Sequence, residues 1–120
     1  MHNEIILTKL EICLEHINAI EIYFGSCNSP EEFFTKNEGL HYDACLMRLQ
    51  ALGENLKKIS EKHPQVIQDL NYRDLSYIIR FRDFLSHHYE KLEQDIVFDT
   101  CKINIPEFKK HLIQFISANK

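Results

Sequence analysis

The chain has 120 residues, a formal net charge of −4, and 44% hydrophobic and 27% charged residues. These values are typical of one globular domain and exclude a disordered or collagen-like chain. Because the chain is acidic overall, any binding of nucleic acid requires a local basic surface. Only three glycines and three prolines are present, too few for the turns of an all-β chain, so long helices are favoured.

The cysteines and the N-terminal stretch both indicate a cytoplasmic protein. The four cysteines form no C-x-x-C pair, and their spacing suggests no disulfide framework, so we expect reduced thiols. The first sixteen residues contain glutamates and no basic leader, which argues against a signal peptide. No run of about eighteen apolar residues occurs, so we expect no membrane span.

The first long helix is predicted by apolar residues that recur every three or four positions. They are Ile6, Leu10, Cys13, Ile17, Ile20 and Phe24. This spacing is typical of one face of an amphipathic helix, and Gly25 is a natural stop. Ser29 then resembles an N-cap, with Pro30 at the first helical position of a short segment. Residues 37–39 (Asn-Glu-Gly) interrupt that segment.

The second long helix follows the same apolar spacing and ends at His63, because the residue before Pro64 is pushed away from helical geometry. Its inward positions are Cys45, Leu49, Leu52, Leu56 and Ile59. Gly53 lies inside this helix, where glycine costs about 1 kcal/mol relative to alanine. A close approach of another helix would explain it. Residues 64–72 form either a connection or a short helix.

The remaining helices are predicted at residues 74–89, at about 95–100, and from Pro106 to the C-terminus. The inward positions are Leu75, Ile78, Ile79 and Leu85 in the first of these and Phe108, Leu112, Phe115 and Ile116 in the last. No sustained period-two strand pattern occurs. The sequence therefore predicts one all-α domain over residues 1–120, an up-and-down bundle of four to five helices.

Residues 82–89 (Arg-Asp-Phe-Leu-Ser-His-His-Tyr) have a polar content that a helical core does not explain. Arg82 continues the apolar stripe of Ile78 and Ile79, so it is expected on or beside the buried face. A guanidinium there needs an anion or a polar cleft, because it keeps its charge. His87 is the kind of side chain that exchanges protons near neutral pH.

The spacing of these residues on an ideal helix constrains their arrangement. Asp83 and His87 are four residues apart, so the carboxylate could orient the imidazole. Arg82 and His87 are five apart, about 140° around the helix. One helix does not easily direct both at the same atom. Two copies of this helix facing each other, or a distortion after Ser86, would do so, and this favours a homodimer.

The pattern R-x4-H-x-Y at Arg82, His87 and Tyr89 resembles the motif of HepT-like proteins in the HEPN superfamily. Two further segments are similar to the family in the same order. Residues 48–56 resemble its "R-L-x-x-x-G-E-x-L" pattern, and residues 95–108 resemble its "I-V-W…L-P" ending. R-x4-H alone is weak, but three segments in order are specific. The long stretch between Pro64 and Arg82 departs from the family pattern.

The resemblance implies a metal-independent endoribonuclease toxin without a cofactor. It implies a homodimer whose cleft is lined by both motif helices, an RNA substrate, and a small nucleotidyltransferase as antitoxin. Carried over by position, Arg82 and His87 would be catalytic and Asp83 supporting. Tyr89 would be the residue that the nucleotidyltransferase modifies with AMP.

Several plainer alternatives remain open on the sequence alone. A histidine on a helix is usually structural, and Tyr89 could be an amphipathic residue at the core edge. His41 and Cys45 have the spacing of half a metal site, but no second pair follows, so we expect no metal. The rival function is a non-catalytic HEPN module that binds a nucleotidyltransferase or nucleotide, and a helical scaffold without enzymatic role is a third possibility.

Overall fold

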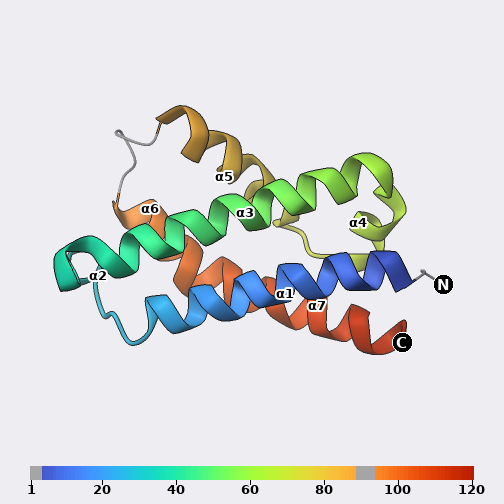
Figure 1. Ribbon diagram of the computed structural model, residues 1–120, viewed down its shortest axis with the longest axis horizontal. Coiled ribbons are helices and arrows are strands. Elements are labelled where there is room, and N and C mark those ends of the chain that lie inside the picture. The colour runs from blue at the N-terminus through green and yellow to red at the C-terminus, as the bar shows by residue number, and fades with distance from the viewer. Residues whose placement is uncertain (1–3, 89–93) are drawn as a thin grey trace.

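A computed structural model describes residues 4–88 and 94–120, with the backbone alone at 85–88 and 94. These residues form helices joined by short turns and contain no strand (Figure 1). The long helices are α1 (Glu4–Phe24), α3 (Leu40–Lys62), α5 (Leu75–His88) and α7 (Ile105–Ala118), and the short ones are α2 (Pro30–Thr35), α4 (Pro64–Leu70) and α6 (Gln94–Asp99). The predicted all-α class is confirmed.

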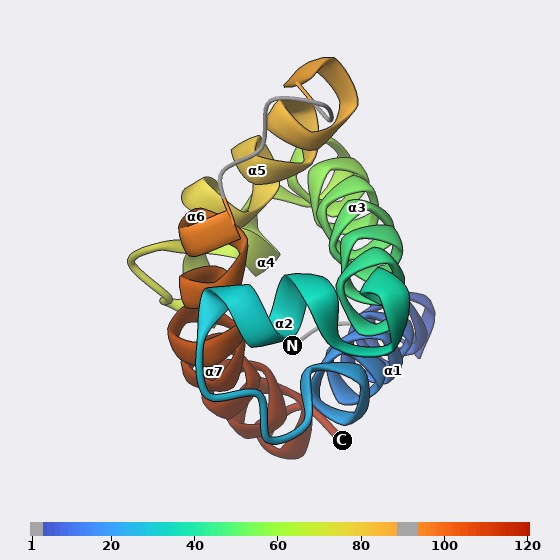
Figure 2. The ribbon, with the colours of Figure 1, turned by 90° about the vertical axis from the view of Figure 1, so that its left-hand side faces the viewer.

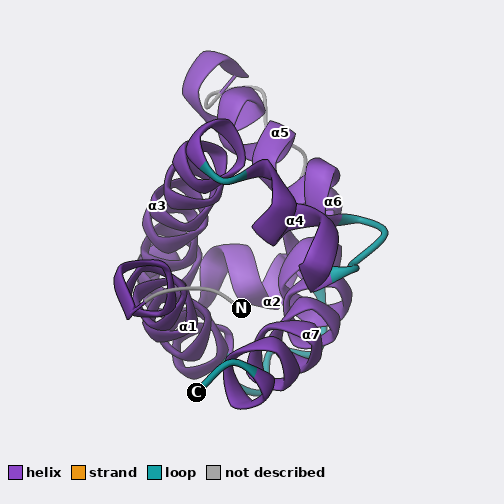
Figure 3. Ribbon diagram, turned by 90° about the vertical axis from the view of Figure 1, so that its right-hand side faces the viewer, coloured by secondary structure: helices purple, strands orange, loops and turns teal. Residues whose placement is uncertain are grey.

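The long helices surround a shared core. α3 packs against α1 on one side and α5 on the other, and α1 also packs against α7. Seen end-on, α2 crosses one end of this arrangement (Figure 2) and α4 lies toward the other end (Figure 3). The motif helix α5 therefore rests on α3, which carries the glycine singled out in the sequence.

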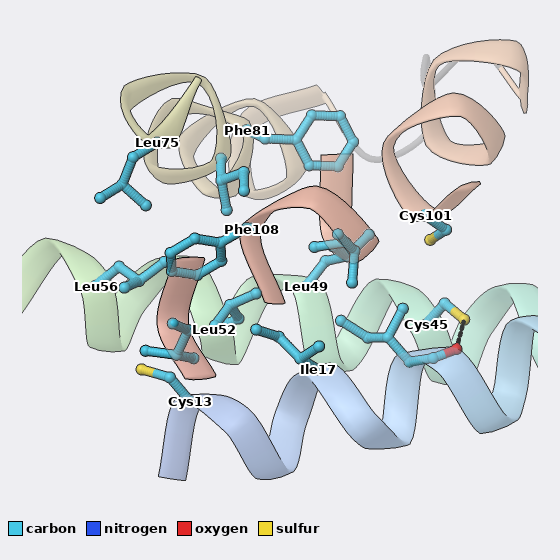
Figure 4. Close-up of a cluster of buried hydrophobic side chains, with 14 of the residues drawn as sticks. Cys13, Ile17, Cys45, Leu49, Leu52, Leu56, Leu75, Phe81, Cys101 and Phe108 are labelled. Carbon is cyan, nitrogen blue, oxygen red and sulfur yellow. Dashed lines mark hydrogen bonds between the residues drawn. The ribbon is translucent and has the colours of Figure 1, made fainter. Parts of the chain in front are cut away.

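The core consists of the apolar stripes that the sequence predicts. The five predicted inward residues of α3 and the four of α7 are all buried, as are Ile6, Leu10, Cys13, Ile17 and Ile20 of α1. Part of this cluster is shown in Figure 4. On α5, Leu75, Ile78 and Phe81 are buried, while Ile79 is half-buried against the core. The side chain of Leu85 lies outside the described residues.

The ends of the helices follow local chemistry. Gly25 has a φ of 57°, which glycine adopts without strain, and it follows the last residue of α1. The Ser29 Oγ accepts a hydrogen bond from the Glu32 N–H at 3.1 Å, so Ser29 caps α2 as predicted. α3 ends at Lys62, before His63 and Pro64, and the segment left open in the sequence contains a helix, α4.

Near the C-terminus, a π-helical turn over Thr100–Asn104 joins α6 to α7. The predicted helix near residue 95 thus begins at Gln94 and continues through this turn, and Pro106 lies in the first turn of α7. Among residues 4–88 and 94–120, every helix is too short or too polar to span a lipid bilayer.

Candidate functional site

Arg82 lies on α5 at the edge of the core rather than sealed within it. Its side chain is 25% exposed, and its Nη1 donates a hydrogen bond to the Asp83 Oδ1 at 2.7 Å. The guanidinium is thus held in place by a carboxylate, and the side chain is only partly exposed, as the sequence predicted for a cation beside the buried face.

Gly53 of α3 lies directly against the stem of Arg82. A Cβ at Gly53 would lie 2.5 Å from the Arg82 Cβ and 3.4 Å from the carbonyl oxygen of Ile78. Real Cβ atoms essentially never show a contact of 2.5 Å. The close helix approach that would explain a glycine at this position is therefore confirmed, and the neighbour is the motif helix itself.

Lys57 belongs to the same site, although no motif in the sequence marks it. Its Nζ lies 3.9 Å from the Asp83 Oδ1, the oxygen that also accepts from Arg82. One carboxylate thus contacts two cations, which leaves the group with a net charge of +1. The sequence feature that could have identified Lys57 is its spacing from Gly53. Lys57 follows Gly53 by four residues and so shares its face of α3. Together, Arg82, Asp83, Lys57 and Gly53 form the candidate site.

The structure describes the other predicted site residues less fully. The backbone of His87 lies in the last turn of α5, four residues after Asp83, and its side chain is outside the described residues. Tyr89 also lies outside them. The predicted contact between Asp83 and His87 therefore stays a prediction. What the structure adds is that Asp83 already contacts Arg82 and Lys57 from one oxygen.

A hollow of about 240 Å³ lies on the other flank of α5, toward α6. Its lining residues are Tyr77, Arg80, Phe81, Phe84 and Ile96. The Tyr77 hydroxyl is hydrogen-bonded to the Thr100 Oγ1 at 2.9 Å, which fixes one ring of the hollow against the π-helical turn. The motif helix thus has a polar flank against α3 and an aromatic flank toward α6.

The half metal site considered in the sequence has other contacts. The His41 Nδ1 lies 2.9 Å from the Tyr23 carbonyl oxygen, and the Cys45 thiol donates to the Ile20 carbonyl oxygen at 3.7 Å. No group of three metal-ligating side chains occurs in the described part of the chain. All four cysteines are buried, and burial raises the pKa of Cys13 to about 12, so this thiol is a poor nucleophile.

Taken together, the fold and the candidate site define an all-helical protein in which one carboxylate, Asp83, contacts an arginine and a lysine at the edge of the core. Comparison with known proteins assigns the family. Residues 13–115 match the family described as Ribonuclease HepT-like. The chain belongs to the HepT-like ribonuclease family, and the match includes every residue of the candidate site and motif.

Two proteins of Methanocaldococcus jannaschii are similar to this chain. One is the proposed RNase MJ1216, 30% identical over 89 residues, which are 74% of this chain and 70% of the relative. The other is the proposed RNase MJ0125, 31% identical over 85 residues, which are 71% of this chain and 70% of the relative. No solved structure matches the chain significantly. The enzyme class is therefore that of a ribonuclease.

Proposed function

We propose that the chain is a metal-independent endoribonuclease toxin of a toxin–antitoxin pair, with Arg82 and His87 as its catalytic residues. The observation that carries this proposal is the position of Arg82 in the structure, in a chain that belongs to a family of ribonucleases. It is half-buried, it is held by Asp83, and it lies on the helix that also carries His87. Family membership supplies the reaction class, and the ion pair supplies a preorganised cation for a phosphodiester.

RNA provides its own nucleophile, so the protein needs only to move protons and stabilise charge. The 2′-oxygen attacks the adjacent phosphorus, and its proton passes to His87. The bond from phosphorus to the 5′-oxygen breaks, the leaving oxygen takes up a proton from water, and His87 returns its own proton to the solvent. The products are a 2′,3′-cyclic phosphate and a 5′-hydroxyl. Arg82 contacts the phosphate oxygens, and its planar fork favours their more charged state in the transition state.

The catalytic assignment is tested by cleavage of single-stranded RNA in the presence of a metal chelator. We expect His87→Ala to lower the rate by about 10²- to 10⁴-fold. Arg82→Ala should lower it by about 10²-fold or more, and Arg82→Lys should restore only part of the loss. His88→Ala is the matched control, since it removes the neighbouring imidazole. Equal cleavage by His87→Ala and His88→Ala would end the assignment.

The same experiment addresses the rival function. If the parent protein cleaves no RNA but binds a nucleotidyltransferase or a nucleotide, the result would support the non-catalytic module. RNA with a single 2′-deoxy nucleotide at the cleaved position tests the chemistry further. Cleavage at that position would rule out attack by the 2′-oxygen.

The proposed homodimer is supported by the helical spacing, because positions 82 and 87 are separated by about 140° on an ideal helix. In a symmetric dimer, each site would take Arg82 from one protomer and His87 from the other. Mixing the inactive Arg82→Ala and His87→Ala proteins would then create heterodimers with one intact site. We expect roughly a quarter of the parental activity after random exchange of subunits. A mixture as inactive as its components would place both residues in one protomer.

Regulation by an antitoxin is the last part of the proposal. A nucleotidyltransferase would transfer AMP from ATP to the hydroxyl oxygen of Tyr89 and release pyrophosphate. The added bulk and negative charge would block the RNA backbone at the site. Incubation with such a partner and ATP should raise the mass of the chain by one AMP group and abolish cleavage. Tyr89→Phe should stay unmodified and active in the same mixture. The proposed toxin and its antitoxin would act in the cytoplasm.

A further inference from the structure

The outer side of the groove between α1 and α3 carries a row of basic side chains in an otherwise acidic protein. They are Lys9 and His16 on α1 and Arg48, Lys58 and Lys62 on α3, and together we call them the basic seam. Figure 2 shows α1 and α3 side by side along one flank of the molecule, with α5 beyond α3. The seam is thus separate from the candidate site but shares α3 with it.

At one end of the seam, three lysines surround a groove of about 120 Å³. Lys9, Lys58 and Lys62 line it together with Asn55 and two isoleucines. Lys58 lies 4.0 Å from Glu54, a weak pair of exposed side chains. Lys9 and Lys62 form no ion pair with any residue that the structure describes. Three ammonium groups line this groove and one carboxylate, Glu54, pairs with one of them, so their summed charge is positive, which favours an anionic ligand.

At the other end, Arg48 is held in place without a carboxylate. Its Nη1 lies 3.1 Å from the His16 Nδ1, and its guanidinium lies 6.0 Å from the centre of the Tyr23 ring. Burial and the neighbouring Arg48 lower the pKa of His16, while Glu15 has the opposite, smaller effect. The neutral imidazole therefore accepts from Arg48 and does not itself neutralise the guanidinium charge.

The seam is long enough to contact more than one phosphate. Arg48 and Lys62 are fourteen residues apart, which corresponds to about 21 Å along a helix. Lys57, at the candidate site, and Lys58, on the seam, are consecutive residues on adjacent faces of α3. A polyanion bound at Arg82 can therefore cross α3 at this point and continue along the seam.

We propose that the basic seam binds the sugar–phosphate backbone of the RNA substrate outside the cleavage site, without reading its sequence. This inference rests on the proposed function for the identity of the polyanion. It assigns the seam a different task from the candidate site, namely affinity for long RNA rather than cleavage. Phosphate contacts of this kind hold a nucleic acid in register and make its affinity depend on salt.

The test compares two variants with the same change in net charge. The seam variant is Lys9→Gln/Lys58→Gln/Lys62→Gln. The control variant is Lys36→Gln/Lys102→Gln/Lys110→Gln, whose exposed lysines lie on other elements. Binding of a fluorescent single-stranded RNA, 2′-O-methylated throughout so that it cannot be cleaved, is measured by anisotropy at several salt concentrations. Far-UV circular dichroism and thermal unfolding show that both variants are folded.

We expect the seam variant to reduce the slope of log affinity against log salt by about 2, at about 0.7 per lost phosphate contact. The control variant should keep the parental slope. Equal slopes and affinities for the two variants would overturn the proposal. The proposal would also be overturned if the seam variant failed to bind an acidic protein partner while the affinity of the seam variant for RNA matched that of the control variant.

Cleavage of a dinucleoside monophosphate separates this inference from the proposed function. This substrate has a single phosphate and cannot occupy both places, so the seam variant should cleave it as fast as the parent. For long RNA, the seam variant should show a raised KM and an unchanged kcat. If the parent cleaves neither substrate, the proposed function fails, while the binding slopes still decide the role of the seam.

Discussion

Gly53 of α3 and Arg82 of α5 contact each other so closely that no side chain fits between them, since a Cβ at Gly53 would lie 2.5 Å from the Arg82 Cβ. Gly53→Ala should therefore destabilise the protein. Overpacking typically costs about 1–3 kcal/mol, against a gain of about 1 kcal/mol in helix propensity. Cleavage should fall as well, because Arg82 must move. Denaturant unfolding measures the first effect and the RNase assay the second.

The control for this substitution is Gln50→Ala, an exposed position on the same helix. It should change the free energy of unfolding by no more than about 0.5 kcal/mol. If Gly53→Ala proves as stable as the parent and fully active, the close contact has no functional consequence.

Asp83 is expected to position Arg82 rather than to contact RNA. Asp83→Asn removes the carboxylate that holds the Arg82 Nη1 at 2.7 Å, so we expect kcat to fall by about 10- to 100-fold. The KM for RNA should stay the same or decrease, because a negative charge is lost near the phosphate. Glu54→Gln is the control, since it removes a nearby charge that holds Lys58 instead. A loss of kcat in both variants would point to general electrostatics.

Lys57 is expected to contribute to binding more than to stability. Its ion pair with Asp83 spans 3.9 Å, and both side chains are more than 40% exposed, so the pair contributes about 0–1 kcal/mol. Lys57→Met should raise the KM for RNA by about 3- to 10-fold and leave kcat nearly unchanged. Lys110→Met, at an exposed position of α7, should leave both constants at the parental values. A large loss of kcat in Lys57→Met would instead assign Lys57 to the reaction itself.

His16 predicts a specific dependence of stability on pH. Its pKa in the folded protein lies below the ordinary value of 6.5, mainly because of burial and then because of Arg48. The unfolded chain therefore binds a proton more readily, so stability contributed by neutral His16 is present above pH 6.5 and is lost as the pH falls below it. His16→Asn keeps an acceptor for Arg48 but does not titrate. As the pH is lowered from 8 to 5, the melting temperature of this variant should fall less steeply than that of the parent. Parallel curves of melting temperature against pH would contradict the assignment.

Much of the fold could be predicted because each long helix buries one apolar stripe, and such a stripe recurs every three or four residues. The stripe from Ile6 to Ile20 and the one from Cys45 to Ile59 both became core. The sequence also indicated the cap at Ser29 and the end of α3 before Pro64, since these depend on neighbouring residues alone. Whether residues 64–72 contain a helix stayed open, because so short a segment is stabilised by packing.

The candidate site shows where prediction from sequence reaches its limit. The motif marked Arg82, and the helical period placed it beside the core. The helical repeat did not show that Gly53 lies against Arg82, or that Lys57 contacts Asp83. The two residues of each pair are more than twenty-five positions apart in the chain. The sequence alone thus determined the helices, the family and the motif, which depend on local spacing. Only the packing of α3 against α5 decided which side chains meet, because contacts between distant residues form only when helices pack together.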